Sequence, residues 1–175
     1  MNQLTDKGNS WYLANFKTFE KHLNGESKTE LHSIRKDALA RFMELGFPST
    51  HNEEWRFTNI LPIANAAFKP ALKESAHEAT AESIQPFLFD DLKCHRLVFL
   101  NGHFSETLSS IHTLPKGVKV LDLSSALKSD YDLVNQYLTK YAKFDENAFT
   151  ALNTAFIEDG AFIFVPDNII VEVPW

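Results

Sequence analysis

Cysteine is almost absent from this chain of 175 residues, and Cys94 is its only representative. One thiol cannot form an internal disulfide, and it cannot supply several thiolates to one metal ion. A reduced lone cysteine is typical of a cytoplasmic protein, so we expect a cytoplasmic location. A lone cysteine is more often an inert structural thiol than a nucleophile.

Glycine is also scarce, and histidine is scattered. The six glycines stand singly, so the sequence has neither a phosphate-binding Gly-rich loop nor a G-x-S-x-G nucleophile elbow. None of the seven histidines forms the i, i+4 pair or the close cluster that is typical of zinc sites. They stand at positions 22, 32, 51, 77, 95, 103 and 112. We therefore assign no metal ligand and no cofactor-binding residue.

Long apolar runs and blocks of like charge are missing as well. No run approaches the roughly 18 apolar residues of a membrane span, and the first residues lack the order of a signal peptide. The net charge is −6 and no basic stripe is present, which disfavours nucleic acid and anionic membranes as partners. A hydrophobic content of 44% is sufficient for a globular core.

Two amphipathic helices are predicted in the first 45 residues. Residues 11–23 place an apolar side chain on one face at every turn, with Ser10 as the expected N-cap. Ser27 and Glu30 have capping-box spacing before the second helix, which Gly46 and Pro48 should end. The expected apolar faces consist of Tyr12, Phe16, Phe19 and Leu23, and of Leu31, Ile34, Ala38, Phe42 and Leu45.

The rest of the chain mixes strands with shorter helices. Prolines limit residues 61–85 to short helical turns or loop, and Asn101-Gly102 predicts a β-hairpin with a type I′ turn. A strand is expected at residues 118–123, followed by helices at 130–141, behind Asp130, and at 147–157, behind Asn147. In the first of these helices Tyr131, Val134, Leu138 and Tyr141 should share one face. The predicted fold class is α+β.

Two β-like runs close the sequence, at 161–165 and 169–173, joined by a turn at 166–168. We expect them to pair and to present an uncovered strand edge. A longer parent protein, or a homodimer formed through this edge, would cover it. The expected division is an N-terminal α+β domain at 1–158 and the first strands of a further element at 159–175.

The stretch "THNEEWRFT", residues 50–58, has the greatest density of reactive groups. Thr50 and Glu53 have capping-box spacing, and Thr58 or Asn59 could cap the next turn. If the segment is extended, Trp55 and Phe57 share one side, and Arg56 pairs with Glu53 or Glu54 or lies on an aromatic ring. Such a packed loop clasp is the preferred interpretation, because no partner for a catalytic base is evident.

Enzymatic alternatives have weaker support. Cys94 with a histidine could form a nucleophile pair, and the carboxylates of Glu53 and Glu54 could serve a small hydrolase. The pairs Asp145-Glu146 and Glu158-Asp159 flank a predicted helix, where they fit a helix-dipole partner and a polar terminator better than a glycosidase pair. We therefore expect no catalytic residue and no enzyme.

Two segments resemble a known family. "NEEWRFTNI", residues 52–60, with Pro48 upstream, is similar to the E-x-W-[KR]-[YF]-T signature near the N-terminus of SufD proteins of the SUF iron–sulfur cluster assembly machinery. "FTALNTAFIEDGAFIFVPDNIIVEVP", residues 149–174, resembles the segment that leads into the β-helix shared by SufD and SufB. The first motif and its position after two helices indicate SufD.

The resemblance implies a scaffold role. It implies that the terminal strands begin a right-handed parallel β-helix, followed by a helical region that docks the ATPase SufC, so that the chain is a truncated N-terminal portion. SufB and SufC are the implied partners, and the iron–sulfur cluster is implied for the full complex, with none bound by this fragment. The remaining alternative is a free-standing interaction module that pairs its strand edge with another chain.

Overall fold

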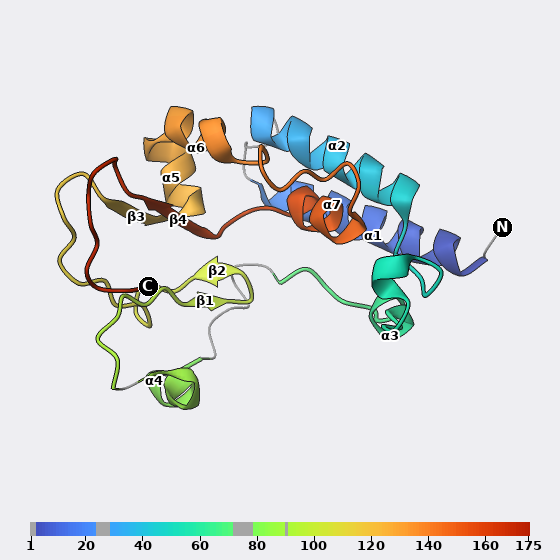
Figure 1. Cartoon of the computed structure of the whole chain (residues 1–175). Helices are drawn as coiled ribbons and strands as arrows, with labels where there is room; N and C mark the ends of the chain where they lie inside the picture. Colours follow the sequence, from blue (N-terminus) through green and yellow to red (C-terminus); the bar gives the residue numbers. More distant parts are fainter. Residues whose placement is uncertain (1–2, 24–28, 72–78, 90) are drawn as a thin grey trace. The chain divides into compact units, whose positions relative to one another are not determined.

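The computed structural model describes residues 3–23, 29–71, 79–89 and 91–175, with side chains from residue 11 onward in the first helix. The chain forms two compact units, whose elements are labelled in Figure 1. Unit 1 comprises Met1–Pro70 and Tyr137–Ile157, and unit 2 comprises Ala71–Gln136 and Glu158–Trp175. Helices occur in both units and strands in unit 2, which confirms the α+β fold class.

Unit 1 is built around three helices: α1 (Gln3–His22), α2 (Glu30–Leu45) and α7 (Ala148–Ala155). Two short elements, η2 (Glu53–Trp55) and α3 (Leu61–Ala64), follow α2. The buried residues of these three helices form a core of two clusters, in which each phenylalanine removed from water contributes about 2 kcal/mol. This core contains Phe16, Phe19, Leu23, Ala38, Leu39 and Ala155, and a second cluster joins Tyr12, Phe42 and Ala151. The predicted apolar face of the first helix is thereby confirmed.

The predicted helix starts are partly wrong. The first helix begins at Gln3, so Ser10 is an interior residue and not the N-cap. In the second helix the Thr29 side chain accepts a hydrogen bond from the backbone N–H of His32, whereas Ser27 lies outside the described residues. The predicted stop is confirmed: Gly46 has φ +64°, and its N–H donates to the Phe42 carbonyl at 2.8 Å.

Small residues let α2 and α7 approach closely. Ala38, Ala151 and Ala155 are completely buried at their contact, so neither helix carries a bulky side chain there. Asn147 caps α7 by accepting a hydrogen bond from the N–H of Thr150, as predicted. The helix ends at Ala155, two residues earlier than expected.

Arg35 is the largest fully buried side chain and links α2 to the end of α7. Its Nε donates to the carbonyl of Ile157 at 2.8 Å, and its guanidinium carbon lies 5.7 Å from the centre of the Phe19 ring. The hydrogen bond and the aromatic face both stabilise a buried cation. Sequence reasoning placed no polar residue in this core.

Unit 2 contains two small antiparallel sheets. The first is the predicted hairpin of β1 (Phe99–Leu100) and β2 (His103–Phe104). Asn101 and Gly102 both have positive φ, 50° and 89°, as a type I′ turn requires. The hairpin prediction is confirmed.

The second sheet differs from the prediction. β3 (Lys119–Asp122) pairs antiparallel with β4 (Ala161–Phe164), with Val120 opposite Ile163. Residues 169–173 form no strand, so the predicted pairing of the two terminal runs is wrong. β-propensity alone could not show that the strand at 119–122 was the better partner. The division at 158/159 and the start of a β-helix at 159–175 stay predictions.

Two helices follow β3 where one was expected. α5 (Leu123–Ser129) begins behind Asp122, whose carboxylate accepts from the N–H of Ser125, and α6 (Tyr131–Tyr137) follows it. The predicted helix at 130–141 is too long, because Thr139 has φ +64° and Tyr141 is 81% exposed. Val134 alone among the four predicted face residues is buried.

The short helices α4 (Ala81–Ile84) and η4 (Gln85–Phe87), with α3, match the predicted turns between prolines.

Asp159 connects the two sheets of unit 2. Its Oδ2 accepts from the backbone N–H of Phe104 in β2 at 2.8 Å. Its Oδ1 accepts from the N–H of Gly160 at 2.8 Å and, at 3.4 Å, from that of Ser124 in α5. One carboxylate thus satisfies backbone donors from three segments.

Candidate functional site

The stretch at residues 50–58 forms a single 3₁₀ turn, η2, and not an extended segment. The predicted Thr50–Glu53 capping box is wrong, since Asn52 precedes the turn and its Oδ1 accepts from the N–H of Ser49 at 2.9 Å. Neither Thr58 nor Asn59 is the N-cap of α3, which is Ile60, but Oδ1 of Asn59 accepts from the N–H of Leu61 at 3.0 Å. These amides fix the path of the chain on either side of the turn.

Trp55 attaches this turn to the helical core of unit 1. Its half-buried ring lies 5.1 Å from that of Phe149 on α7, at an interplanar angle of 35°. Phe149 in turn lies 5.6 Å from Phe47, whose ring contacts Phe42 and Tyr12 edge to face. Such aromatic pairs add stability beyond the area they bury. The packed clasp is therefore present, with α7 as its second half.

The neighbouring Phe57 has the opposite environment. It is 94% exposed, and the guanidinium carbon of Arg56 lies 5.6 Å from its ring centre. The expectation that Trp55 and Phe57 share one side is wrong, because the chain turns between them. Of the two predicted roles for Arg56, the aromatic contact is observed, and no ion pair to Glu53 or Glu54 occurs among the described ion pairs.

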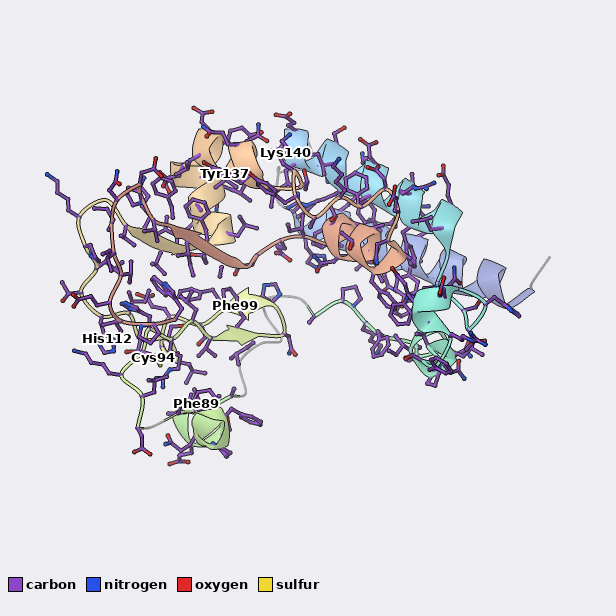
Figure 2. All side chains as sticks on the ribbon, viewed as in Figure 1. Phe89, Cys94, Phe99, His112, Tyr137 and Lys140 are labelled. Atoms are coloured by element: carbon purple, nitrogen blue, oxygen red, sulfur yellow. The ribbon has the colours of Figure 1, made fainter. Side chains whose placement is uncertain are left out.

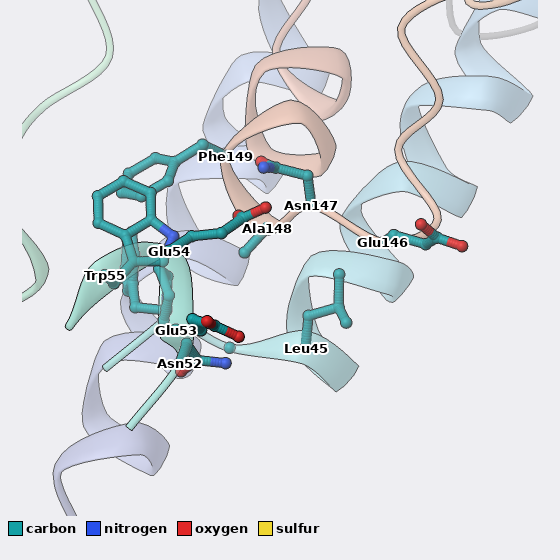
Figure 3. A pocket seen from close by; sticks show the side chains of 12 residues that line it. Leu45, Asn52, Glu53, Glu54, Trp55, Glu146, Asn147, Ala148 and Phe149 are labelled. Atoms are coloured by element: carbon teal, nitrogen blue, oxygen red, sulfur yellow. The ribbon is translucent and has the colours of Figure 1, made fainter. Parts of the chain in front are cut away.

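A cavity of about 270 Å³ lies between this turn, the end of α2 and the start of α7. Trp55 and Phe149 form one wall, and the carboxylates of Glu53, Glu54 and Glu146 lie around it; Figure 3 shows Glu146 across the cavity from Glu54. The remaining lining residues are Leu45, Gly46, Phe47, Pro48, Asn52, Asn147 and Ala148. None of these twelve described residues is a histidine, cysteine, serine or lysine.

The chemistry of this cavity is that of a binding surface. Carboxylates could accept or donate protons, but the lining supplies no nucleophile or electrophilic cation to act with them. The aromatic wall and the carboxylates offer contacts for an apolar or basic group instead. The hydrolase alternative through Glu53 and Glu54 gains no support from this arrangement.

An exposed apolar row continues from the turn along unit 1. It consists of Phe57, Leu61, Ile63 and Phe68, each about half exposed or more. No charged residue occurs between positions 57 and 68. Exposed apolar side chains that cluster along one segment are typical of interaction surfaces. Sequence reasoning missed this row, because apolar residues between prolines could equally have been core.

Cys94 makes no hydrogen bond to a histidine among the described residues of unit 2. Cys94 is a free, partly buried thiol on the loop before β1, and Figure 2 labels it together with His112. His95 is buried and interacts with His112 and Trp175. In the part of the chain that the structure describes, no three histidine, cysteine or acidic side chains are placed to hold a metal ion.

One residue of each acidic pair has a structural contact, Asp145 through its backbone and Asp159 through its carboxylate. The backbone carbonyl of Asp145 accepts from Nε of Arg41 on α2, just before α7 begins. Asp159, expected to be a simple polar terminator, accepts the three backbone hydrogen bonds of unit 2 described above. Sequence reasoning missed this role, since two of its donors, Phe104 and Ser124, lie far away in the sequence.

The sequence matches one protein family over almost its whole length. The family described as "SufBD protein N-terminal region" matches residues 6–175. No solved structure gives a significant match. Among the described helices, none is both long and apolar enough to cross a bilayer.

Curated relatives belong to the same group. The chain is 28% identical over 152 residues to the iron–sulfur cluster assembly SufBD family protein slr0076 of Synechocystis, which covers 87% of this chain and 33% of the relative. It is 29% identical over 170 residues to the iron–sulfur cluster assembly protein SufD of Bacillus subtilis, covering 93% and 36%. It is 26% identical over 161 residues to ABCI9 of Arabidopsis thaliana, covering 80% and 33%. The chain thus spans about a third of the length of these relatives.

Proposed function

This chain belongs to the SufBD N-terminal family, and we propose that it is a non-catalytic, partner-binding region of a SufD-type scaffold subunit in cytoplasmic iron–sulfur cluster assembly. The signature of residues 52–60 gives the main support. In this signature Trp55 faces the protein core and packs on Phe149, whereas Phe57 faces the solvent and is 94% exposed. The first holds the segment in place and the second opens the exposed apolar row.

The exposed apolar row supports the partner-binding part of the proposal. Leaving large apolar side chains in water is unfavourable by about 25 cal/mol for each Å² that a partner could cover. Phe57 and Leu61 expose much of their surface, so their burial would contribute to binding. We propose SufB and SufC as partners of the whole protein, consistent with the SufD name of the Bacillus relative.

The test uses the full-length protein with SufB and SufC. The double variant Phe57→Ser, Leu61→Ser should reduce co-purification of the complex, while the unfolding midpoint of the variant stays near that of the parent. The matched control is the double variant Phe87→Ser, Phe89→Ser at exposed apolar positions of unit 2, which should co-purify at the parental level. Complex formation at the parental level in the double variant would contradict the assignment of this row to partner binding.

The chain does not have the donor set for an iron–sulfur cluster of its own. Such clusters are usually held by four thiolates, and the sequence has one cysteine. We propose that the cluster is cargo of the complete assembly, so the isolated chain incubated with iron, sulfide and reductant should not gain stoichiometric, stable cluster absorbance. Stable loading that the variant Cys94→Ser abolishes would overturn this view.

A second candidate function, strand-edge pairing, has two observations in its favour. Within the described residues β4 pairs with β3 alone, and Ile163 is 40% exposed. An unpaired strand edge can accept a strand from another chain or from a second copy. If the chain dimerises through this edge, Ile163→Lys should shift its elution toward the monomer in size-exclusion chromatography. If the Ile163→Lys variant still elutes as a dimer at the parental volume, the dimer interface does not include this strand edge.

A further inference from the structure

His95 in unit 2 is held between two aromatic neighbours. Its side chain is almost completely buried, with 2% exposed, although it stands in a loop. The ring of Trp175 stacks on it at 4.3 Å and 25°, and the ring of His112 lies 5.5 Å away. We call these three residues the terminal stack.

The hydrogen bonds of the terminal stack require a neutral His95. The backbone N–H of His112 donates to Nδ1 of His95 at 3.1 Å, so that nitrogen must carry a lone pair, and the ring proton is on Nε2. The buried Nε2 has no hydrogen-bond partner among the described residues. The backbone N–H of His95 donates to the carbonyl of Pro174 at 2.7 Å. Both the ring and the backbone of His95 thus hold the segment 174–175.

Protonation of the His95 ring would oppose its hydrogen bond with His112 and its burial. A proton on Nδ1 would face the N–H of His112, replacing a hydrogen bond with a repulsion between two donors. The new charge would also be buried beneath Trp175 with no carboxylate recorded against the ring. Burial lowers the pKa of His95, and the nearby His112 lowers it further.

Few other charges lie on the segments that meet at His95. Its own segment carries Lys93 and Arg96, and the Nε of Arg96 donates to the carbonyl of Leu108. The His112 segment adds Lys116 four residues on, and the terminal segment adds Glu172, three residues before Trp175. His112 is the titratable group that acts on the charge of His95.

We propose that His95 is a proton-operated latch: its neutral ring holds Pro174 and Trp175 against unit 2, and its protonation releases them. Because the pKa of His95 is lower in the folded chain than its ordinary value of 6.5, the latch is fully closed above that pH. It weakens as the pH falls below 6.5 toward the lowered folded value. The released segment would expose the indole of Trp175 to a partner or to the solvent.

The first experiment follows the environment of Trp175 directly. The 175-residue chain, labelled with fluorotryptophan, is titrated from about pH 7.5 to pH 4.5 across the histidine range. The fluorine resonance that Trp175→Phe removes should move toward its unfolded position, with a midpoint below 6.5. His95→Gln, which cannot take up a proton, should abolish this movement. The matched control His51→Gln, at an exposed histidine of unit 1, should leave it unchanged.

The second experiment tests the reverse coupling and does not depend on the fold of the His95 variant. If Trp175 lowers the pKa of His95 by covering it, Trp175→Ala should raise the titration midpoint of the His95 ring, followed by NMR of labelled histidine. A short Gly-Ser extension after residue 175 repeats the measurement with the α-carboxylate moved away. An unchanged His95 midpoint in Trp175→Ala, or a Trp175 resonance that stays fixed while His95 titrates, would overturn the latch.

Discussion

Trp55 and Phe149 lie 94 positions apart in the sequence, and their rings meet at 5.1 Å, at an interplanar angle of 35°. This contact joins the segment after α2 to the first turn of α7. The signature stretch therefore acts as a tether between the two halves of unit 1's sequence. Its acidic residues, Glu53 and Glu54, lie on the cavity beside the tether.

Removing the tether should destabilise unit 1. Trp55→Ala removes the contact with Phe149, and we expect a loss of about 2 kcal/mol in the free energy of unfolding. This is less than the 3 to 5 kcal/mol typical of a fully buried aromatic residue, because Trp55 is half-buried. Denaturant unfolding of the parent and of Trp55→Ala measures this difference. The comparison requires that the free energy of unfolding depends on denaturant concentration with the same slope in both proteins.

The matched control is Phe57→Ala, two residues further along. Phe57 is 94% exposed, so its removal should change the free energy of unfolding by less than about 0.5 kcal/mol. Equal losses in the two variants would show that Trp55 is no more structural than its exposed neighbour.

Asp159 should be the most sensitive acidic residue of unit 2. Asp159→Ala leaves the backbone N–H of Phe104 without its charged acceptor, and we expect a loss of about 2 to 3 kcal/mol in the free energy of unfolding. Hydrogen exchange at the Phe104 amide should accelerate in the variant. Glu158→Ala, at the preceding carboxylate, is the control and should leave both quantities close to the parent.

Local signals account for the parts of the fold that sequence reasoning predicted. The Asn101-Gly102 turn, the Asn147 cap and the Gly46 stop each depend on residues within a few positions. Their conformational requirements are strong, since positive φ or a capping oxygen is restricted to few residue types. The regular spacing of apolar residues likewise predicted which side chains of the first helix are buried.

Three features that sequence reasoning missed depend on distant partners. Residues 169–173 have high β-propensity, but β4 pairs with β3 instead. The burial of Arg35 depends on the carbonyl of Ile157, more than a hundred residues away. The role of Asp159 likewise depends on Phe104. Propensity and periodicity carry no information about such contacts, because tertiary packing decides them.

Acid should weaken unit 2 through two aspartates. A hydrogen bond from Lys119, then one from Ser129, holds the pKa of Asp130 below its ordinary value of 3.8. Burial alone would raise the pKa of Asp122, but hydrogen bonds from Ser125 and Ser124 outweigh it and lower this pKa as well. Each carboxylate therefore stabilises the fold above about pH 3.8, and this stabilisation is lost as the pH falls through the lowered folded values.

The aspartate effect is measured by unfolding across the acid range. Asp122→Asn should lower the free energy of unfolding at neutral pH. Below pH 3.8 the free energy of unfolding of this variant should fall less steeply with decreasing pH than that of the parent. Asp132→Asn, at an exposed carboxylate of α6, is the control and should keep the parental slope. If the free energy of unfolding of Asp122→Asn falls with pH as steeply as that of the parent, other carboxylates cause the acid destabilisation.

The contact of α2 with α7 should not tolerate a larger side chain at position 151. Ala151 is completely buried beside Phe42 and Tyr12, so Ala151→Leu must displace packed rings or move α7. We expect a loss of about 1 to 3 kcal/mol in the free energy of unfolding, as is typical of overpacked cores. The control is Asn153→Leu, which introduces the same side chain at an exposed position of α7 and should be nearly neutral. Because α7 also carries Phe149, Ala151→Leu should loosen Trp55 and red-shift its fluorescence, whereas a stable variant with parental fluorescence would show that the helices can separate without disturbing the tether.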